Sequence, residues 1–346
     1  MNKPEIFHSI PEGFLDTPPD RLKSVLKAPA LLHLIGEKEP PLFLVTLLHG
    51  NEPTGVGAIQ KFLKKYFVNG KLEGLPRSLI LFVGNVQSAK ENLRRLPGQN
   101  DFNRIWNGGD SPEHEMARSV IEYAKSQNVF FCVDIHNTSG KNPHYSCVNR
   151  LDAQTINLAR IFSTTLIYFT EPHEVLSLAF SNICPAITIE AGMPDDPISE
   201  PHVLSFLEKV FSLNSLPSTL NEADVKVYHS MVRIKVPKEC SIVFGGPSQN
   251  ADYCFLEALD SLNFNLLPVG TLLGWRYNPD FSLIILDENN RDVEKDYIEY
   301  CGNEIRLKRS VIPAMLTTDK KIVHQDCLGY LMEPYPLPEN LSAKQC

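Results

Sequence analysis

Two side chains of the kind that bind divalent cations lie three residues apart, where an apolar run of the sequence ends. The segment LFLVTLLHGNEP, residues 42–53, leads from apolar residues to His49 and Glu52. An imidazole nitrogen and a carboxylate oxygen can each bind zinc at ~2 Å. Such a pair is common by chance, so its place at the exit of an apolar run is what indicates a metal site.

A third ligand is expected on another strand, because a catalytic zinc usually takes three protein ligands and leaves a position for water. The segment FFCVDIHNTSG supplies His136 after a second apolar run. For any one of these residues, a hydrogen-bonded polar group at a strand end explains the sequence equally well. Three of them at equivalent positions favour a metal site.

A further carboxylate follows a third apolar run, PAITIEAGMP, at Glu190. A carboxylate beside an activated water can remove a proton from it and later pass that proton to a leaving amine. Standing alone, Glu190 could equally be a helix cap or the partner of an arginine.

Polar residues gather in NDFNRIW, which contains Asp101, Asn103 and Arg104. A planar guanidinium binds a carboxylate through two hydrogen bonds, and a neighbouring amide can add a donor, so an anionic substrate would suit this pair. Upstream, Arg94 or Arg95 could stabilise the oxyanion that forms when water attacks an amide carbonyl. For Arg94 we favour a solvated loop charge.

The elements that must position these residues follow from the apolar pattern. Runs without strict alternation predict strands that are covered on both faces. Helical patterns lie between them, and one opens with Ser111 as N-cap and Pro112 in the first turn. This alternation predicts a mainly parallel, mixed sheet flanked by helices. The strands are expected at 41–48, 78–85, 129–136, 164–170 and 185–191, and the helices at 54–67, 111–128, 152–165 and 200–213.

The pattern changes near residues 214–224. Beyond them helical periodicity fades, and short apolar segments alternate with Gly, Pro, Asn and Asp, which indicates short strands and turns. We therefore expect an α/β catalytic domain over residues 1–222 and a smaller β-rich C-terminal domain over residues 223–346.

Composition narrows the class of protein. The formal net charge of -8 argues against a nucleic-acid partner, because such proteins neutralise phosphates with basic residues. The eight cysteines form no CxxC pair, and neither a signal peptide nor a membrane span is evident, so a reducing cytoplasm and no membrane partner are expected. A dinucleotide fingerprint and a GxSxG elbow are also missing from the sequence.

Taken in order, the segments HGNE, D-x-N-R, D-I-H-N-T and I-E-x-G resemble the succinylglutamate desuccinylase/aspartoacylase family, within the wider group of zinc carboxypeptidase-like enzymes. The resemblance covers roughly residues 40–195. It implies one Zn²⁺ per chain, bound by His49, Glu52 and His136, with Glu190 as general base and acid.

The same resemblance implies roles for the polar loop. Asn103 and Arg104 would grip a substrate carboxylate, and Asp101 would orient the imidazole of a metal ligand, His49. Arg95 would help to polarise the scissile carbonyl. At this point the family usually has Arg-Tyr, whereas this chain has Arg95 followed by Leu.

Three functions stay open at the level of sequence. The first is a zinc amidohydrolase that removes the acyl group from a small N-acyl amino acid, similar to N-succinylglutamate or N-acetylaspartate. A β-rich tail that closes the site against long chains would favour it over the second, a metallocarboxypeptidase acting on peptides. The third is a non-catalytic binding protein on the same fold. The acyl group, the amine half and the oligomeric state are not fixed, and a homo-oligomer is compatible with the sequence.

Overall fold

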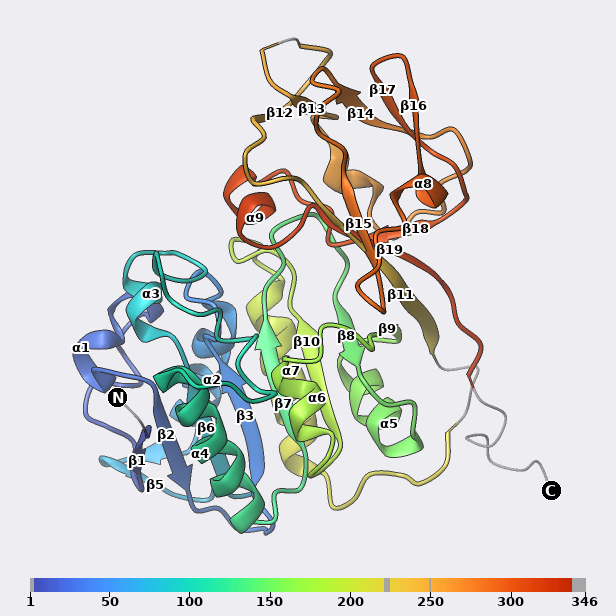
Figure 1. The fold of residues 1–346 in the computed structure, drawn as a ribbon. Helices are drawn as coiled ribbons and strands as arrows, with labels where there is room; N and C mark the ends of the chain where they lie inside the picture. The colour runs from blue at the N-terminus through green and yellow to red at the C-terminus, as the bar shows by residue number, and fades with distance from the viewer. Residues whose placement is uncertain (1–2, 221–224, 249, 338–346) are drawn as a thin grey trace, which may run out of the picture. The chain divides into compact units, whose positions relative to one another are not determined.

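The computed structural model describes residues 3–220, 225–248 and 250–337 (Figure 1). The chain divides into two units. The first contains the described residues of Met1–Asn137, His144–Val227 and Pro336–Cys346, and the second consists of Thr138–Pro143 and Tyr228–Tyr335. The domain boundary expected between residues 222 and 223 lies outside the described residues.

A mixed sheet forms the centre of the first unit. The neighbouring strands β6, β3, β7 and β10 run parallel to one another, whereas β2 pairs with β6 and β8 pairs with β10 in antiparallel fashion. The strand order is β1 (Glu5–Phe7), β2 (Ala30–Leu34), β6 (Leu79–Val83), β3 (Leu42–Thr46), β7 (Cys132–His136), β10 (Ala186–Glu190), β8 (Tyr145–Val148) and β9 (Thr165–Tyr168).

The three strands β3, β6 and β7 are buried along their whole length. This explains why their sequences are continuously apolar rather than alternating, since helices cover both faces of the sheet. One layer contains α2 (Thr54–Lys64), α5 (Ala153–Phe162) and α7 (Ser199–Ser212), of which α7 contacts both others. The other contains α4 (Pro112–Ser126) and α6 (Leu176–Phe180), which share a core cluster with the sheet. The predicted fold class is confirmed.

Short elements complete the first unit. The predicted N-cap of α4 is present, because the Ser111 side chain accepts a hydrogen bond from the backbone N–H of His114. The sequence patterns did not reveal α6 or the strand β8. The remaining elements are η1 (Pro19–Arg21), α1 (Lys23–Leu26), α3 (Val86–Lys90) and the hairpin strands β4 (Phe67–Val68) and β5 (Lys71–Leu72).

The second unit is rich in β-structure, as predicted. Strand β11 (Lys226–Lys235) begins where the chain passes from the first unit to the second, and it pairs with β15 (Ile284–Asp287) and β19 (Gly329–Pro334), next to which lies β18 (Ile312–Ala314). A second sheet has the order β12 (Ile242–Phe244), β13 (Tyr253–Phe255), β14 (Leu272–Arg276), β17 (Glu304–Leu307) and β16 (Ile298–Cys301). The helices are short: η3 (Leu259–Leu262), α8 (Glu294–Tyr297) and α9 (Lys320–Gln325).

One strand boundary differs from the expectation in a way that matters for chemistry. The strand predicted over residues 41–48 ends at Thr46, and Leu47 takes a left-handed backbone conformation with φ of 56°. The carbonyls of both residues accept hydrogen bonds from the backbone that follows β6, from Gly84 and Asn85 respectively. Because these bonds hold the chain after the strand, Leu47 turns it sharply just before His49.

The lengths of the helices bear on whether any of them could cross a membrane. In the ranges that the structure describes, no helix is both long and apolar enough to traverse a lipid bilayer.

Candidate metal and catalytic site

Three predicted metal ligands converge at the ends of β3 and β7. One ligand atom from each of His49, Glu52 and His136 lies within 4.8 Å of the others, and all three side chains are buried. The Nδ1 atom of His49 lies 2.8 Å from one Glu52 oxygen, and the Nδ1 atom of His136 lies 2.8 Å from the other. The Glu52 carboxylate therefore bridges the neighbouring His49 and His136, which follows Glu52 by 84 positions.

The turn that carries the first two ligands is fixed by a glycine. A Cβ atom on Gly50 would lie 2.2 Å from the backbone nitrogen of Ala89 in α3, so only glycine fits this close approach. The Gly50 N–H donates to the carbonyl of Arg94, and the Glu52 N–H donates to that of His49. These contacts bring the imidazole and the carboxylate to one side of the turn.

Each imidazole has a second carboxylate on its other nitrogen. The Nε2 atom of His49 lies 3.1 Å from Asp101, and that of His136 lies 2.8 Å from Asp134. Asp134 is fully buried, two residues before His136 on β7. The Nε2 atoms can donate to Asp101 and Asp134, which hold the rings in place. Both Nδ1 atoms face the Glu52 carboxylate, so they and Glu52 are the donors that a cation would share.

The pKa values reflect this crowding of charge. Burial alone raises the pKa of Glu52, but the imidazoles of His49 and His136 outweigh it and hold that pKa below its ordinary range. Burial lowers the pKa of His136, yet Asp134 and Glu52 outweigh it and raise that pKa well above the ordinary value. Buried carboxylates stay ionised only when positive charge lies nearby, so a cluster of them suits the binding of a cation.

Glu190 ends β10 directly beside His136, with which it is in register. Desolvation raises its pKa to about 8, His136 opposes this rise, and the negative charges of Glu52 and Asp134 add to it. The residue as a whole keeps some exposure, while its carboxyl group is desolvated. A carboxyl group that titrates near neutral pH is suited to accept and return a proton.

The polar loop approaches the same cluster through Asp101. This carboxylate bonds to His49, to the backbone N–H of Asn103 at 2.8 Å and to Nε of Arg94 at 2.9 Å. Burial raises the pKa of Asp101, but the charges of Arg94 and His49 outweigh it and hold that pKa well below its ordinary value. The charge of Arg104 acts in the same direction.

Asn103 is oriented by a neighbouring element. Its Oδ1 accepts a hydrogen bond of 3.0 Å from the backbone N–H of Leu176 at the start of α6. Because the acceptor end of the amide is engaged in this way, its Nδ2 donors are the part that can meet a substrate carboxylate. Arg104 Nη1 donates to the backbone carbonyl of Asn103, which holds the guanidinium group against the same loop.

The expectation that Arg94 is a solvated loop charge is wrong. Its side chain is 10% exposed and forms an ion pair with Asp101, and its charge also lowers the pKa of Glu190. Arg95, the next residue, is half-buried. The role expected for Arg95 stays a prediction.

Sequence reasoning missed two buried residues at the site, Asp134 and Asn137. A signal for Asp134 was present, because positions i and i+2 of a strand face the same side and Asp134 precedes His136 by two. Asn137 lay inside the D-I-H-N-T segment, but its side-chain partners are distant in the sequence.

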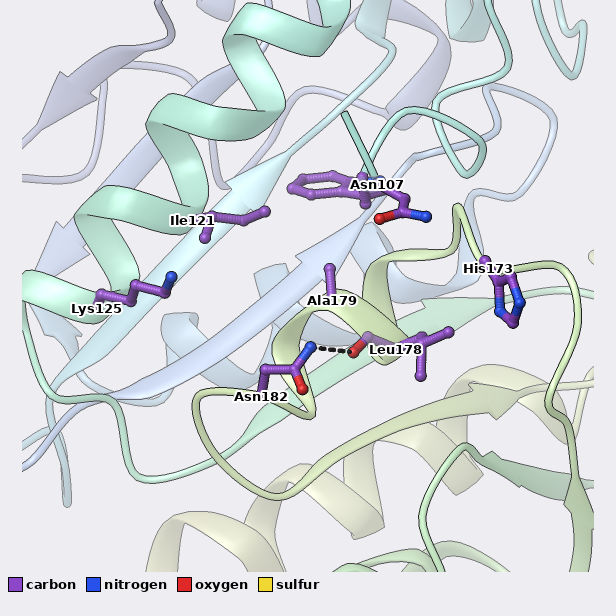
Figure 2. A pocket seen from close by; sticks show the side chains of 8 residues that line it. Asn107, Ile121, Lys125, His173, Leu178, Ala179 and Asn182 are labelled. Carbon is purple, nitrogen blue, oxygen red and sulfur yellow. Dashed lines mark hydrogen bonds between the residues drawn. The ribbon is translucent and has the colours of Figure 1, made fainter. Parts of the chain in front are cut away.

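A separate cavity of about 450 Å³ lies beside the polar loop, between α4 and α6 (Figure 2). None of the predicted metal, catalytic or substrate-binding residues lines it, so it is distinct from the cluster. Its walls are formed by Trp106, Asn107, Ile121, Lys125, His173, Leu178, Ala179 and Asn182.

Comparison with protein families identifies the class to which this fold and site belong. Residues 38–212, about half of the chain, match the succinylglutamate desuccinylase/aspartoacylase catalytic domain. The chain belongs to this family of deacylases. The matched segment contains every predicted site residue.

Solved structures give the same fold. The succinylglutamate desuccinylase from Chromobacterium violaceum is 16% identical with a TM-score of 0.54, and the comparison covers 86% of each chain. A succinylglutamate desuccinylase/aspartoacylase from Rhodobacter sphaeroides is 14% identical with a TM-score of 0.55 and covers 88% of each chain. Murine aminoacylase 3 is 14% identical with a TM-score of 0.52, over 86% of this chain and 97% of its own. No curated protein matches the sequence.

Proposed function

We propose that the protein is a zinc-dependent amidohydrolase that cleaves the acyl group from a small N-acyl amino acid, of the N-succinylglutamate or N-acetylaspartate type. The observation that carries this proposal is the convergence of His49, Glu52 and His136, with Glu190 on the adjacent strand. A cytoplasmic location, and no nucleic-acid or membrane partner, complete the proposal. The net charge of -8 supports the absence of a nucleic-acid partner.

The donor set fits zinc, because two imidazoles and one carboxylate are a common set of ligands for a catalytic zinc. When bound, zinc supplies Lewis-acid chemistry: it acidifies water and polarises a carbonyl group. Asp101 and Asp134 would hold the two imidazoles with Nδ1 directed toward the cation.

Glu190 performs the proton transfers in this proposal. It takes a proton from the attacking water while the water oxygen bonds to the acyl carbon. When the carbon–nitrogen bond breaks, Glu190 returns the proton to the departing amine. The pKa of about 8 that burial gives this carboxyl supports the role, since a base works best when its pKa is near the working pH.

The polar loop holds the substrate. Arg104 and the Nδ2 donors of Asn103 bind a carboxylate of the amino acid, and Arg95 stabilises the oxyanion. Fixing both ends of the scissile amide in this way restricts its motion toward the attacking water. To test the oxyanion role, Arg95→Ala is compared with Arg94→Ala, in which Asp101 also loses its arginine partner.

The deciding experiment is a hydrolysis panel of N-succinyl- and N-acetyl-amino acids beside short peptides, with and without a chelator. We expect cleavage of acyl-amino acids, loss of activity on chelation and recovery with zinc. Faster cleavage of peptides would favour the carboxypeptidase. Zinc content near zero in folded protein, with no turnover, would favour a binding protein.

A further inference from the structure

The side chain of Asn137 connects segments that are far apart in the sequence. It is 6% exposed and directly follows His136. Its Oδ1 accepts a hydrogen bond from the backbone N–H of Thr54 at 3.2 Å, and its Nδ2 donates to Thr54 Oγ1 at 2.8 Å. Nδ2 also donates to the carbonyl of Gly192 at 2.8 Å. The amide therefore ties the start of α2 to the chain that follows β10.

The backbone of Asn137 directly contacts the cluster formed by His49, Glu52 and His136. Its N–H lies 3.2 Å from the Glu52 oxygen that also bonds to His136. Thr54 lies two residues after Glu52, and Gly192 lies two residues after Glu190. Asn137 thus contacts Glu52 directly, directly follows His136, and bonds to the segment that follows Glu190.

The hydrogen bonds of the Asn137 side chain leave it no donor for a substrate. Both Nδ2 hydrogens are donated within the protein, and Oδ1 has accepted one bond, so Asn137 differs from Asn103, whose donor end is available for a carboxylate. Gly192 has φ of +78°, a conformation that favours glycine, and this turn brings its carbonyl to Asn137. This turn explains why a glycine occupies the last position of the I-E-x-G segment.

We propose that Asn137 is a positioning residue that sets the placement of Glu52 and His136 relative to Glu190. It acts through the Thr54 and Gly192 hydrogen bonds and does not touch substrate. This inference rests on the proposed metal-hydrolase function and deepens it.

The main test compares Asn137→Ala with Asn157→Ala. Asn157 is a matched control in the same unit, since it is 2% exposed and its Nδ2 donates to the carbonyls of Pro217 and Thr219, far along the chain from the site. Zinc affinity is measured by competition with a chelator. We expect Asn137→Ala to weaken it about 10- to 100-fold, as for other residues that support metal ligands, and Asn157→Ala to leave it unchanged.

Steady-state kinetics at saturating zinc give a second readout. Because the base and the ligands lose their mutual placement, kcat should fall in Asn137→Ala while KM changes by less than about threefold. Equal behaviour of the two asparagine variants in zinc affinity and in kcat would overturn the inference.

A milder variant guards against a failure to fold. Thr54→Val keeps the side-chain shape and replaces the Oγ1 hydroxyl, which accepts from Asn137, with a methyl group, so it should shift zinc affinity in the same direction by a smaller factor. Combined with Asn137→Ala, it should add little, because both changes remove the same hydrogen bond. Full additivity of the two changes would contradict the proposed link.

Amide hydrogen exchange in chelator-treated protein separates this inference from the proposed function. Asn137→Ala should speed exchange in residues 52–57 and 190–199 together, and Asn157→Ala should speed neither. If the wild type hydrolyses no acyl-amino acid but this paired effect appears, the proposed function fails and the positioning role stands. If hydrolysis is normal and exchange in both segments is unchanged, the positioning role fails.

Discussion

The two units treat their buried charge differently. In the first, the buried carboxylates of Glu52, Asp101 and Asp134 face imidazoles. In the second, the buried carboxylate of Asp260 accepts a hydrogen bond from the backbone N–H of Lys141, whose ammonium group lies 3.7 Å away. The backbone and a lysine satisfy the Asp260 carboxylate, whereas carboxylates arranged around two imidazoles offer the donor atoms that a cation can bind.

The largest expected effect is on kcat, and it is tested by replacing one carboxylic acid with its amide in each unit. Glu190→Gln should lower kcat about 100- to 10,000-fold, because the amide cannot accept the proton of water, while zinc content stays near one per chain. Asp260→Asn is the matched change in the second unit and should keep kcat within about twofold. Near-normal hydrolysis by Glu190→Gln would contradict the role of Glu190 as the base.

The next effect concerns the cation itself. Zinc at about 100 times its Kd should stabilise the wild type by about 2.7 kcal/mol, seen as a rise in thermal midpoint. His136→Ala should abolish this rise. His229→Ala, which removes an imidazole paired with Glu288 in the second unit, should preserve it. A zinc-induced rise that survives in His136→Ala would place the cation elsewhere.

A smaller effect tests how the first unit recognises anions. Arg104→Ala should raise KM about 10- to 100-fold for substrates with a free carboxylate, since a hydrogen bond to a charged group contributes about 1.5–3 kcal/mol. Amide analogues of the same substrates should be affected far less. Arg276→Ala, an arginine of the second unit, provides the control, and a KM that rises equally in both variants would contradict substrate binding by Arg104.

The smallest effect is a pH dependence of stability in chelator-treated protein. Burial raises the pKa of Glu190 from an ordinary 4.5 to about 8, so the folded state holds a proton that the unfolded state releases. Its contribution to stability is complete below pH 4.5 and is lost as the pH rises toward 8. Glu190→Gln should therefore lose less stability than the wild type between pH 5 and pH 8 in denaturant titrations. Parallel curves would show that Glu190 titrates normally.

Much of the fold was predictable because burial on both faces imposes continuous apolar runs. The runs at β3, β6, β7, β9 and β10 all lie within their predicted ranges. Strand β8 was missed, since its four residues, YSCV, carry too little pattern and its pairing with β10 is a long-range event. The turn at Leu47 was missed because neighbouring backbone, rather than its own residue type, imposes it.

The convergence of His49, Glu52 and His136 was predictable because each follows an apolar run closely. Asn137 was not, since its partners Thr54 and Gly192 lie 83 and 55 positions away and no local pattern reveals them. Arg94 was misjudged for a related reason: its burial depends on Asp101, seven positions further along an irregular loop.

The close approach of Gly50 to α3 has a practical consequence for protein engineering. Any side chain at this position would collide with the backbone of Ser88 and Ala89 at 2.2–2.3 Å. A randomised library that aims to alter selectivity through the HGNE turn should therefore leave this residue constant, and directed evolution would find its useful diversity in other loops.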